Sequence, residues 1–245
     1  MKTTVFLIVL LFFNIEAEEF KSAQLRYARV KEAYQEKEES LRALYIEKGL
    51  DFNKQSIFLR VFKREKTLEL WVKSSGTQYV LLKSYAICSA SGDLGPKRKM
   101  GDYQVPEGFY HIDRFNPQSN FFLSLGLNYP NASDKVLSDK QNPGGDIFIH
   151  GNCVSIGCMA MTDSKIKEIY LVAVEAKNNG QINIPVHIFP FKMTDDNMHF
   201  FNRQYKEEQA LFTFWQNLKQ GYDYFEKNKK VPIVSVNTNG NYFYK

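Results

Sequence analysis

The sequence predicts an α+β fold, in which a β-rich domain with a mixed or mainly antiparallel sheet carries helical extensions at its N- and C-terminal ends. Three observations lead to this prediction. Apolar residues recur at helical spacing up to about residue 49 and again over residues 194–227. Between these two segments, apolar and polar residues alternate along short runs, which is typical of strands. Gly- and Pro-rich stretches separate the runs.

The first residues have the pattern of a cleaved secretory signal. Lys2 precedes an uninterrupted apolar run from Val5 to Phe13, and the small residue Ala17 precedes two glutamates. The run is much shorter than the roughly 20 residues that a transmembrane helix requires. We therefore predict a signal peptide over residues 1–17 and a mature chain in the periplasm or cell envelope, with no transmembrane segment after cleavage.

Composition indicates a packed globular protein and argues against a nucleic-acid partner. Charged residues make up 24% of the chain and aromatic residues 15%. The formal net charge of +5 is spread along the chain and forms no dense basic stripe interleaved with aromatic residues. A mildly basic protein of this kind is compatible with an anionic partner such as cell-wall polymer.

The N-terminal half predicts a helical segment followed by strands. Residues 18–54 form the helical segment, in which Gly49 after Lys48 is a plausible helix end. Residues 56–63 and 68–73 read as a hairpin, and residues 78–87 read as a further strand. A long loop rich in Gly and Pro then leads into short strands at 109–112 and 120–125.

The C-terminal half predicts a strand over residues 146–150, a helix over 162–181, a strand over 184–191 and a helical tail over 194–227. Thr162 and Asp163 are candidate N-caps of the first helix, and Gly180 is a candidate stop. We assign residues 55–193 to the β-rich domain and residues 194–245 to a C-terminal helical extension.

The stretch "DIFIHGNCVSIGCMAMTD" contains one histidine and two cysteines, the residue types most suited to metal binding or nucleophilic catalysis. One hypothesis is a zinc site, with His150, Cys153 and Cys158 as ligands and Cys88 or His111 as a distant fourth. The spacing matches no common zinc signature, so we predict neither a metal nor a cofactor.

The second hypothesis is a cysteine nucleophile, which requires a thiol, a base, a group that orients the base and donors for an oxyanion. Cys158 would be the nucleophile and His150 the base, with the carbonyl of Gly151 orienting the imidazole. The amides of Gly157 and Cys158 would face the oxyanion, and the imidazole would lower the pKa of the thiol. Ser155 would buttress the loop, bind substrate or simply cap a turn.

These residues also carry a family resemblance. "IHG…S-x-G-C", "SASGDLGPKRKMGDYQVPEGFYHI", "FFLSLGLNYPNASDK" and "EIYLVAVEAKNNGQINIPVHIFPFKMT" resemble the YafK-like branch of the YkuD-type L,D-transpeptidases, over roughly residues 56–194. The resemblance implies that residues 55–193 form a YkuD-like catalytic domain. It also implies that Cys158 is acylated by peptidoglycan stem peptides at the L-centre of diaminopimelate and passes the acyl group to an amine.

The sequence departs from the commoner family pattern at two places. That pattern has a histidine two positions before the nucleophile and an arginine two positions after it, where this chain has Ile156 and Ala160. Hydrolysis is therefore an alternative, either as an L,D-carboxypeptidase or as an amidase that releases a wall-linked protein or peptide. A second alternative is a non-catalytic domain that binds the cell wall.

Three cysteines in an exported chain can form one disulfide within the chain, which leaves one thiol unpaired or available for a bridge to another chain. We predict that Cys88 and Cys153 approach one another and form a disulfide, which leaves Cys158 free. The alternatives are a Cys153–Cys158 pair and unpaired, buried cysteines. In the long loop, Lys97 is a candidate for binding substrate carboxylates, with Arg98 and Lys99 beside it. Tyr110 is a further candidate for the cleft wall, as are Tyr85 and His111.

Overall fold

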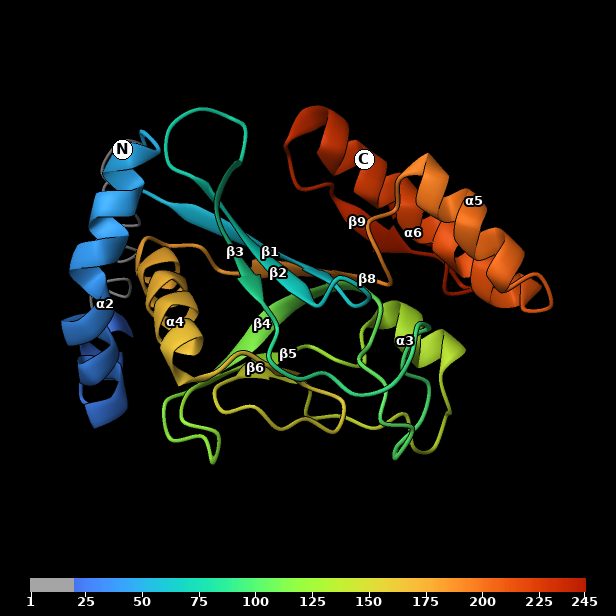
Figure 1. Ribbon diagram of the computed structural model, residues 1–245, viewed down its shortest axis with the longest axis horizontal. Helices are drawn as coiled ribbons and strands as arrows, with labels where there is room; N and C mark the ends of the chain where they lie inside the picture. Colours follow the sequence, from blue (N-terminus) through green and yellow to red (C-terminus); the bar gives the residue numbers. More distant parts are fainter. Residues whose placement is uncertain (1–19) are drawn as a thin grey trace, which may run out of the picture.

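A computed structural model describes residues 20–245 of the chain, so the predicted signal peptide at residues 1–17 lies outside the described residues. A single curled sheet forms the centre of the molecule, with helices on either side of it (Figure 1). Within residues 20–245, no helix is both long and apolar enough to cross a bilayer.

The central sheet has eight strands in the order β3-β2-β1-β8-β4-β5-β6-β7. β1 pairs with β8 and β6 pairs with β7 in parallel, whereas the other neighbours are antiparallel. The sheet is therefore mixed, and the predicted α+β class is confirmed. Its strands are β1 (Ser56–Phe62), β2 (Thr67–Lys73), β3 (Val80–Ala86), β4 (Gly108–Asn116), β5 (Ser124–Leu127), β6 (Phe148–His150), β7 (Met159–Ala160) and β8 (Ile184–Phe189).

Helices cover both faces of the sheet, as Figure 1 shows. On one face lie α2 (Ala28–Glu47) and α4 (Asp163–Asn178). On the other lie α5 (Asp195–Gln204), α6 (Gln209–Asn228) and a small hairpin of β9 (Val234–Val236) and β10 (Tyr242–Tyr244). Successive residues of a strand point to opposite faces, so Val61 joins the core under α2 and α4 while Phe62 joins the core under α5 and α6. This two-sided burial explains why β1 is apolar at most positions.

The long loop between β3 and β4 is anchored by the buried carboxylate of Glu107. One Glu107 oxygen accepts hydrogen bonds from Lys63 Nζ (3.0 Å) and the Gly95 amide (2.7 Å), and the other accepts from Trp215 Nε1 of α6 (2.8 Å). A buried carboxylate needs such donors. The loop therefore has a fixed course, which carries Lys97 toward the strand ends at β6 and β7.

The structure differs from the predicted elements in several places, among them β4, which extends to Asn116, and β7, which was not predicted. β5 begins at Ser124, not near residue 120, because residues 120–122 form a turn in which Phe122 has a φ of +71°. The helical tail consists of two helices that are separated at residues 205–208. The sequence did not predict the C-terminal β9–β10 hairpin or the short helix α3 (Ala132–Leu137), which begins with a capping box between Asn131 and Asp134.

Candidate active site

Two neighbouring strands bring His150 and Cys158 together. His150 is the last residue of β6, and Cys158 directly precedes β7. The two strands run parallel and pair Ile149 with Met159 and His150 with Ala160. Because residues two apart in a strand point the same way, Cys158 and His150 share one face of the sheet.

Both side chains line one cavity of about 510 Å³ at the end of the sheet formed by β5, β6 and β7. The other walls come from the β3–β4 loop at 97–103, from residues 116–124 and from residues 144–148. Several large apolar side chains at this cavity are exposed, namely Met100, Tyr103, Phe121 and Ile156. The candidate nucleophile and the candidate base therefore open onto the same solvent-accessible space.

Gly151 orients the imidazole of His150. Nδ1 of the ring lies 2.6 Å from the Gly151 carbonyl oxygen, and because a carbonyl only accepts, Nδ1–H is the donor. This tautomer leaves Nε2 as the basic nitrogen. The ring is buried and lies against Phe121, with 4.6 Å between the ring centroids. Burial lowers the pKa of His150 below its ordinary value, although the bond to Gly151 opposes this, so the imidazole is neutral at pH 7.

Only glycine fits at position 151. An added Cβ would come within 2.6 Å of the Asp163 carboxylate and 2.7 Å of the Phe121 carbonyl oxygen. The Gly151 amide donates to the Leu123 carbonyl (3.1 Å), and the following amide, that of Asn152, donates to Asp163 (2.7 Å). The carbonyl that orients His150 is thereby held between β5 and the start of α4.

Cys158 is half-buried and is the free cysteine among the described residues. Its thiol lies 3.6 Å from the Asp146 carbonyl oxygen, to which it donates. Burial raises the pKa of the thiol, and the Asp146 carboxylate adds to this increase. A hydrogen bond from the Phe148 backbone and the positive charge of Lys97 have the opposite, smaller effect. The expectation of a lowered thiol pKa is therefore wrong, because burial outweighs the nearby donors and a neutral imidazole supplies no charge.

Ser155 closes a tight turn around the backbone of Cys158. The Cys158 amide donates to Ser155 Oγ (3.0 Å), and the Ser155 hydroxyl donates to the Cys158 carbonyl (2.6 Å). The Cys158 amide is therefore occupied and does not point freely into the cavity. The amide of Gly157, a buried residue with a φ of +114°, donates to no acceptor within residues 20–245. Gly157 lies between two residues that line the cavity, Ile156 and Cys158, but is not itself a lining residue, and its free amide is the remaining candidate for an oxyanion donor.

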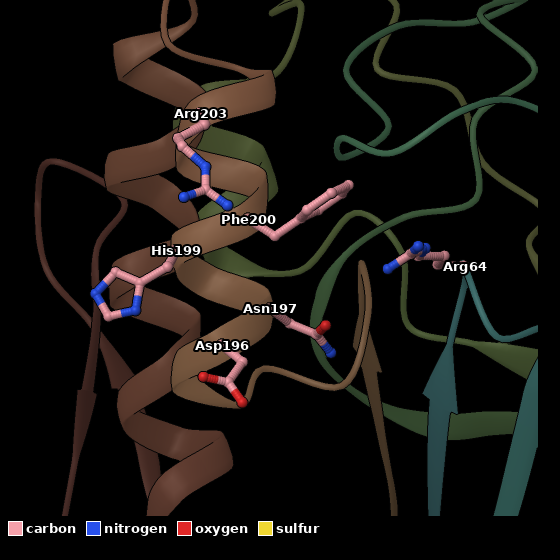
Figure 2. Close-up of a pocket in the computed structure, with 6 residues that line it drawn as sticks. All are labelled: Arg64, Asp196, Asn197, His199, Phe200 and Arg203. Atoms are coloured by element: carbon pink, nitrogen blue, oxygen red, sulfur yellow. The ribbon is translucent and has the colours of Figure 1, made fainter.

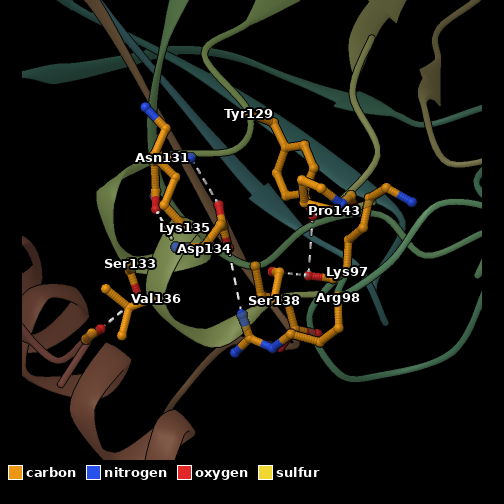
Figure 3. Close-up of polar contacts among 12 residues, drawn as sticks. Lys97, Arg98, Tyr129, Asn131, Ser133, Asp134, Lys135, Val136, Ser138 and Pro143 are labelled. Carbon is orange, nitrogen blue, oxygen red and sulfur yellow. Dashed lines mark hydrogen bonds and ion pairs between the residues drawn. The ribbon is translucent and has the colours of Figure 1, made fainter. Parts of the chain in front are cut away.

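Of the three basic residues in the long loop, Lys97 is the one that lines the cavity. Its ammonium group donates to Asp102 Oδ1 (2.6 Å) and to the Lys99 carbonyl (2.9 Å). Its own carbonyl accepts from the hydroxyls of Tyr129 and Ser138 (Figure 3). Lys97 is thus a nearly buried cation in the cavity wall, held in place on both its side chain and its backbone.

The other residues predicted for the cleft lie elsewhere. Tyr110 is buried, and its hydroxyl donates to Asp134 Oδ2 (2.9 Å). Arg98 reaches toward Asp134, with 3.5 Å between Nη1 and Oδ1, as Figure 3 shows. Tyr85 donates to Glu168 of α4. Tyr110 therefore belongs to a buried hydrogen-bond network and does not line the cavity.

Cys88 and Cys153 are joined by a disulfide, with 5.4 Å between their Cα atoms. The bond takes both sulfurs out of the zinc ligand set considered above. It also leaves Cys158 without a disulfide partner.

Residues that the sequence did not single out also shape the site. Asp146 faces the thiol through its carbonyl, and Phe121 packs on the imidazole. Asp146 begins the stretch that ends at His150, so its position in sequence was a usable signal. Phe121 lies in a turn far from His150 in sequence, and no local pattern indicated its place.

A second cavity of about 590 Å³ lies between Arg64, in the turn after β1, and helix α5 (Figure 2). Its lining includes His199, Phe200 and Arg203 but no cysteine. It is separate from the cavity that contains Cys158.

Comparison with known proteins gives a consistent result. The family model YkuD, described as the L,D-transpeptidase catalytic domain, matches residues 49–188, which is more than half of the chain. The curated Escherichia coli K12 protein "Putative L,D-transpeptidase YafK" is 45% identical over 190 residues, covering 76% of this chain and 72% of that protein.

Two solved structures are more distantly similar. The helical cell shape determining protein Pgp2 from Campylobacter jejuni is 17% identical with a TM-score of 0.45, covering 76% of this chain and 74% of that one. Bd1075 from Bdellovibrio bacteriovorus is 20% identical with a TM-score of 0.41, covering 75% of this chain and 78% of that one. The match to the family model and the identity to the Escherichia coli relative are sufficient to assign the family. They confirm the family resemblance of the sequence, and the chain belongs to the YkuD family of L,D-transpeptidase catalytic domains.

Proposed function

We propose that this protein is an exported cysteine enzyme of the L,D-transpeptidase class that acts on peptidoglycan stem peptides. Cys158 would form a thioester at the L-centre of diaminopimelate and then pass the acyl group to an amine. Membership of the YkuD family supports the class of reaction. The observation that carries the assignment to residues is that Cys158 and a neutral, oriented His150 line the same cavity.

Acylation starts from a neutral thiol and a neutral imidazole, as the two pKa shifts indicate. The sulfur attacks the substrate carbonyl carbon while Nε2 of His150 accepts the thiol proton. The carbonyl oxygen becomes an oxyanion, to which the free amide of Gly157 donates. One such donor contributes roughly 3–4 kcal/mol to lowering the barrier.

Collapse of this intermediate breaks the C–N bond to the leaving group, and His150 returns its proton to the departing amine. The product is a thioester on Cys158 and a free amine, such as D-alanine. An acceptor amine then attacks the thioester, His150 takes the amine proton, and the sulfur leaves and regains that proton. Gly151 would act throughout by holding the Nδ1–H tautomer, which keeps Nε2 as the basic nitrogen.

Lys97 suits a role in binding substrate carboxylates. Lys97 is one of the residues that line the cavity, and its ammonium group is paired with Asp102. The two hydrogen bonds that it donates leave one N–H available. A charge-assisted bond to a stem-peptide carboxylate would place the scissile carbonyl near the sulfur. Ser155 would support the loop by its two hydrogen bonds with Cys158.

Digestion of purified sacculi tests the proposal. Wild type and Cys158→Ala are incubated with sacculi, and the muropeptides are separated by chromatography and identified by mass spectrometry. New crosslinks between two diaminopimelate residues, present with wild type and absent with Cys158→Ala, are the expected result. Shortened stems or released wall-linked protein would instead identify the hydrolase, and unchanged muropeptides would indicate a non-catalytic wall-binding domain.

Export is tested separately by N-terminal sequencing of the protein from the cell envelope. We expect the chain to begin just after Ala17. A protein that retains Met1 in the cytoplasm would contradict export.

A further inference from the structure

The segment that carries Cys158 is held at both ends by one short stretch of chain, Cys88–Ser89. Upstream of the nucleophile, Cys88 is bonded covalently to Cys153. Downstream, the amides of Cys88 and Ser89 donate to the Ala160 carbonyl (2.8 and 3.2 Å), and the Ala160 amide donates to the Ser89 carbonyl (3.0 Å). Residues 153–160 therefore form a closed loop whose two ends meet at the end of β3.

The downstream end of this loop is fixed independently of the disulfide. Ala160 is fully buried and lies between Ser89 on one side and His150 of β6 on the other. The Met161 amide also donates to the His150 carbonyl (2.7 Å). Strand pairing thus holds the chain after Cys158 whether or not the disulfide is present.

The upstream part has few other restraints. The side chains of Val154 and Ile156 are 53% and 80% exposed and contribute little packing. The Cys153 amide is bound only by the neighbouring Asn152 side chain (2.6 Å). The preceding residue, Asn152, is held by its amide, which donates to Asp163 (2.7 Å), and by its carbonyl, which accepts from the Thr162 amide (2.9 Å), and Gly157 is buried. Between these two points, and apart from the contact with Asn152 and the turn that Ser155 makes with Cys158, the disulfide is the one covalent or hydrogen-bonded link from residues 153–157 to the rest of the described chain.

From this arrangement we infer that Cys88 and Cys153 are positioning residues for Cys158, so that reduction of their disulfide lowers turnover. The inference rests on the proposed role of Cys158 as nucleophile. With the disulfide intact, the loop holds Cys158 half-buried in the wall of the cavity that His150 also lines. With the disulfide broken, the upstream part moves away from the end of β3, and the thiol is no longer held at attack distance from the substrate carbonyl.

The chemical step is a simple reduction. Dithiothreitol supplies two electrons and two protons, the sulfur–sulfur bond breaks, and Cys88 and Cys153 become thiols. Dithiothreitol itself is oxidised to its cyclic disulfide. Cys153 is exposed to solvent, so the reductant reaches the bond in the folded protein.

The test compares oxidised wild type, reduced wild type and the double variant Cys88→Ser/Cys153→Ser. Two readouts are followed at a temperature where circular dichroism shows each protein folded. One is turnover of a stem peptide, and the other is the pH dependence of Cys158 alkylation by iodoacetamide, located by peptide mass mapping. The second readout requires no enzymatic activity.

We expect kcat to fall by about 10- to 100-fold in the reduced and double-variant proteins, with KM changed by less than about 3-fold, because a displacement of 1 Å at a reacting atom has effects of this size. Alkylation of Cys158 should reach its midpoint at a lower pH, since the sulfur loses the burial that raises its pKa. Reoxidation of reduced wild type should restore both values, and the double variant should not respond to reductant.

Gly221→Ala is the control for a general loss of stability, because it crowds α6 and leaves the nucleophile loop unchanged. It should keep the wild-type kcat and alkylation profile below its melting temperature. If the double variant does not fold, reduced wild type supplies the same comparison.

A folded double variant or reduced wild type with wild-type kcat and alkylation profile overturns the inference. If no protein shows turnover but the alkylation midpoint still falls on reduction, the proposed function fails and the positioning of Cys158 stands. If turnover is present and the midpoint and kcat do not respond to reduction, the proposed function stands and the positioning role is wrong.

Discussion

In the proposed mechanism, His150 determines which proton transfers Cys158 can make. Its Nδ1–H is committed to the Gly151 carbonyl, so only Nε2 can accept a proton. Burial keeps both the imidazole and the thiol in their neutral forms at pH 7. The protein therefore rests as a neutral pair, and in the proposed mechanism the thiolate forms during attack on the substrate.

The pH dependence of the reaction follows from these two shifts. His150 must be neutral to act as a base, and its pKa is below the ordinary value of about 6.5. We expect the acid limb of kcat/KM to have its midpoint below pH 6.5. Iodoacetamide alkylation of Cys158 in the oxidised protein should still be rising at pH 9, since burial raises the thiol pKa above 9.0. An alkylation profile that levels off near pH 7, typical of a preformed ion pair, would show this description of the resting state to be incorrect.

Replacement of the base tests its role directly. His150→Gln should lower kcat by roughly 10²–10⁴-fold, which is the usual contribution of a general base. His199→Gln is the matched control, because His199 is an exposed residue of α5 that lines only the second cavity (Figure 2). Steady-state kinetics with a stem peptide measure both. Equal activity of the two variants would remove His150 from the mechanism.

At the scale of elements, α6 depends on a glycine for its close approach to the sheet. A Cβ on Gly221 would lie 2.4 Å from the Tyr244 ring and 2.6 Å from the Phe109 ring. Phe109 is buried in the core beneath α6, and Tyr244 is half-buried and packs against this core, so neither ring can move freely. We expect Gly221→Ala to lower the free energy of unfolding by about 1–3 kcal/mol, the usual effect of overpacking, as measured by urea denaturation.

Gly145→Ala is the matched control for this substitution. An added Cβ there meets no atom within 4 Å, and the backbone is not in the left-handed region. The free energy of unfolding should stay the same or rise by about 0.4–1 kcal/mol, because alanine restricts the unfolded chain. If Gly145→Ala loses as much stability as Gly221→Ala, steric crowding of the added Cβ is not the cause of the loss at Gly221.

The sequence predicted elements best where the local pattern and the tertiary environment agree. β1 and β2 are apolar runs that are buried on both faces of the sheet, and α4 has clear end signals in the sequence, so these elements lie close to their expected positions. The predicted start of β5 was wrong because Phe121 and Phe122 are typical strand residues but lie in a turn, from which Phe121 packs against the His150 ring. The β9–β10 hairpin depends on packing against α6 and Phe109, which is a long-range contact that no local pattern reveals.

The same reasoning applies to the site. His150, Gly151 and Cys158 lie within one short stretch, and the structure places them around a common cavity. Lys97 reaches this cavity from a distant loop, and its loop position had suggested substrate contact. Tyr110 was misplaced because strand alternation gives no information on which face meets the cavity. In the structure, its hydroxyl meets Asp134 in a buried network.

At the scale of the whole molecule, Asp134 links three distant segments. Its carboxylate accepts hydrogen bonds from Tyr110 of β4 and from the Asn131 amide, and it lies 3.5 Å from Arg98 of the long loop. Asn131 in turn donates to Tyr242 of β10 (2.9 Å). Burial is the dominant influence and raises the pKa of Asp134 to about 6.

This shift makes stability depend on pH. The folded state binds a proton at Asp134 more tightly than the unfolded state does, so the contribution of this group is fully present below about pH 4 and is lost as pH rises through about 6. Urea unfolding at pH 4 to 7 should show the stability of wild type falling relative to Asp134→Asn, by about 3 kcal/mol at most. A difference between the two proteins that does not change with pH would contradict the shift.

The central claim, that Cys158 is acylated by a stem peptide, is tested most directly by intact-protein mass spectrometry. The oxidised protein is mixed with a tetrapeptide stem that ends in D-alanine, quenched in acid, weighed and mapped by proteolysis. We predict an added mass equal to the stem less D-alanine, located on Cys158 in wild type and absent in Cys158→Ala. Turnover without such an adduct on Cys158, or an adduct that persists in Cys158→Ala, would contradict the account.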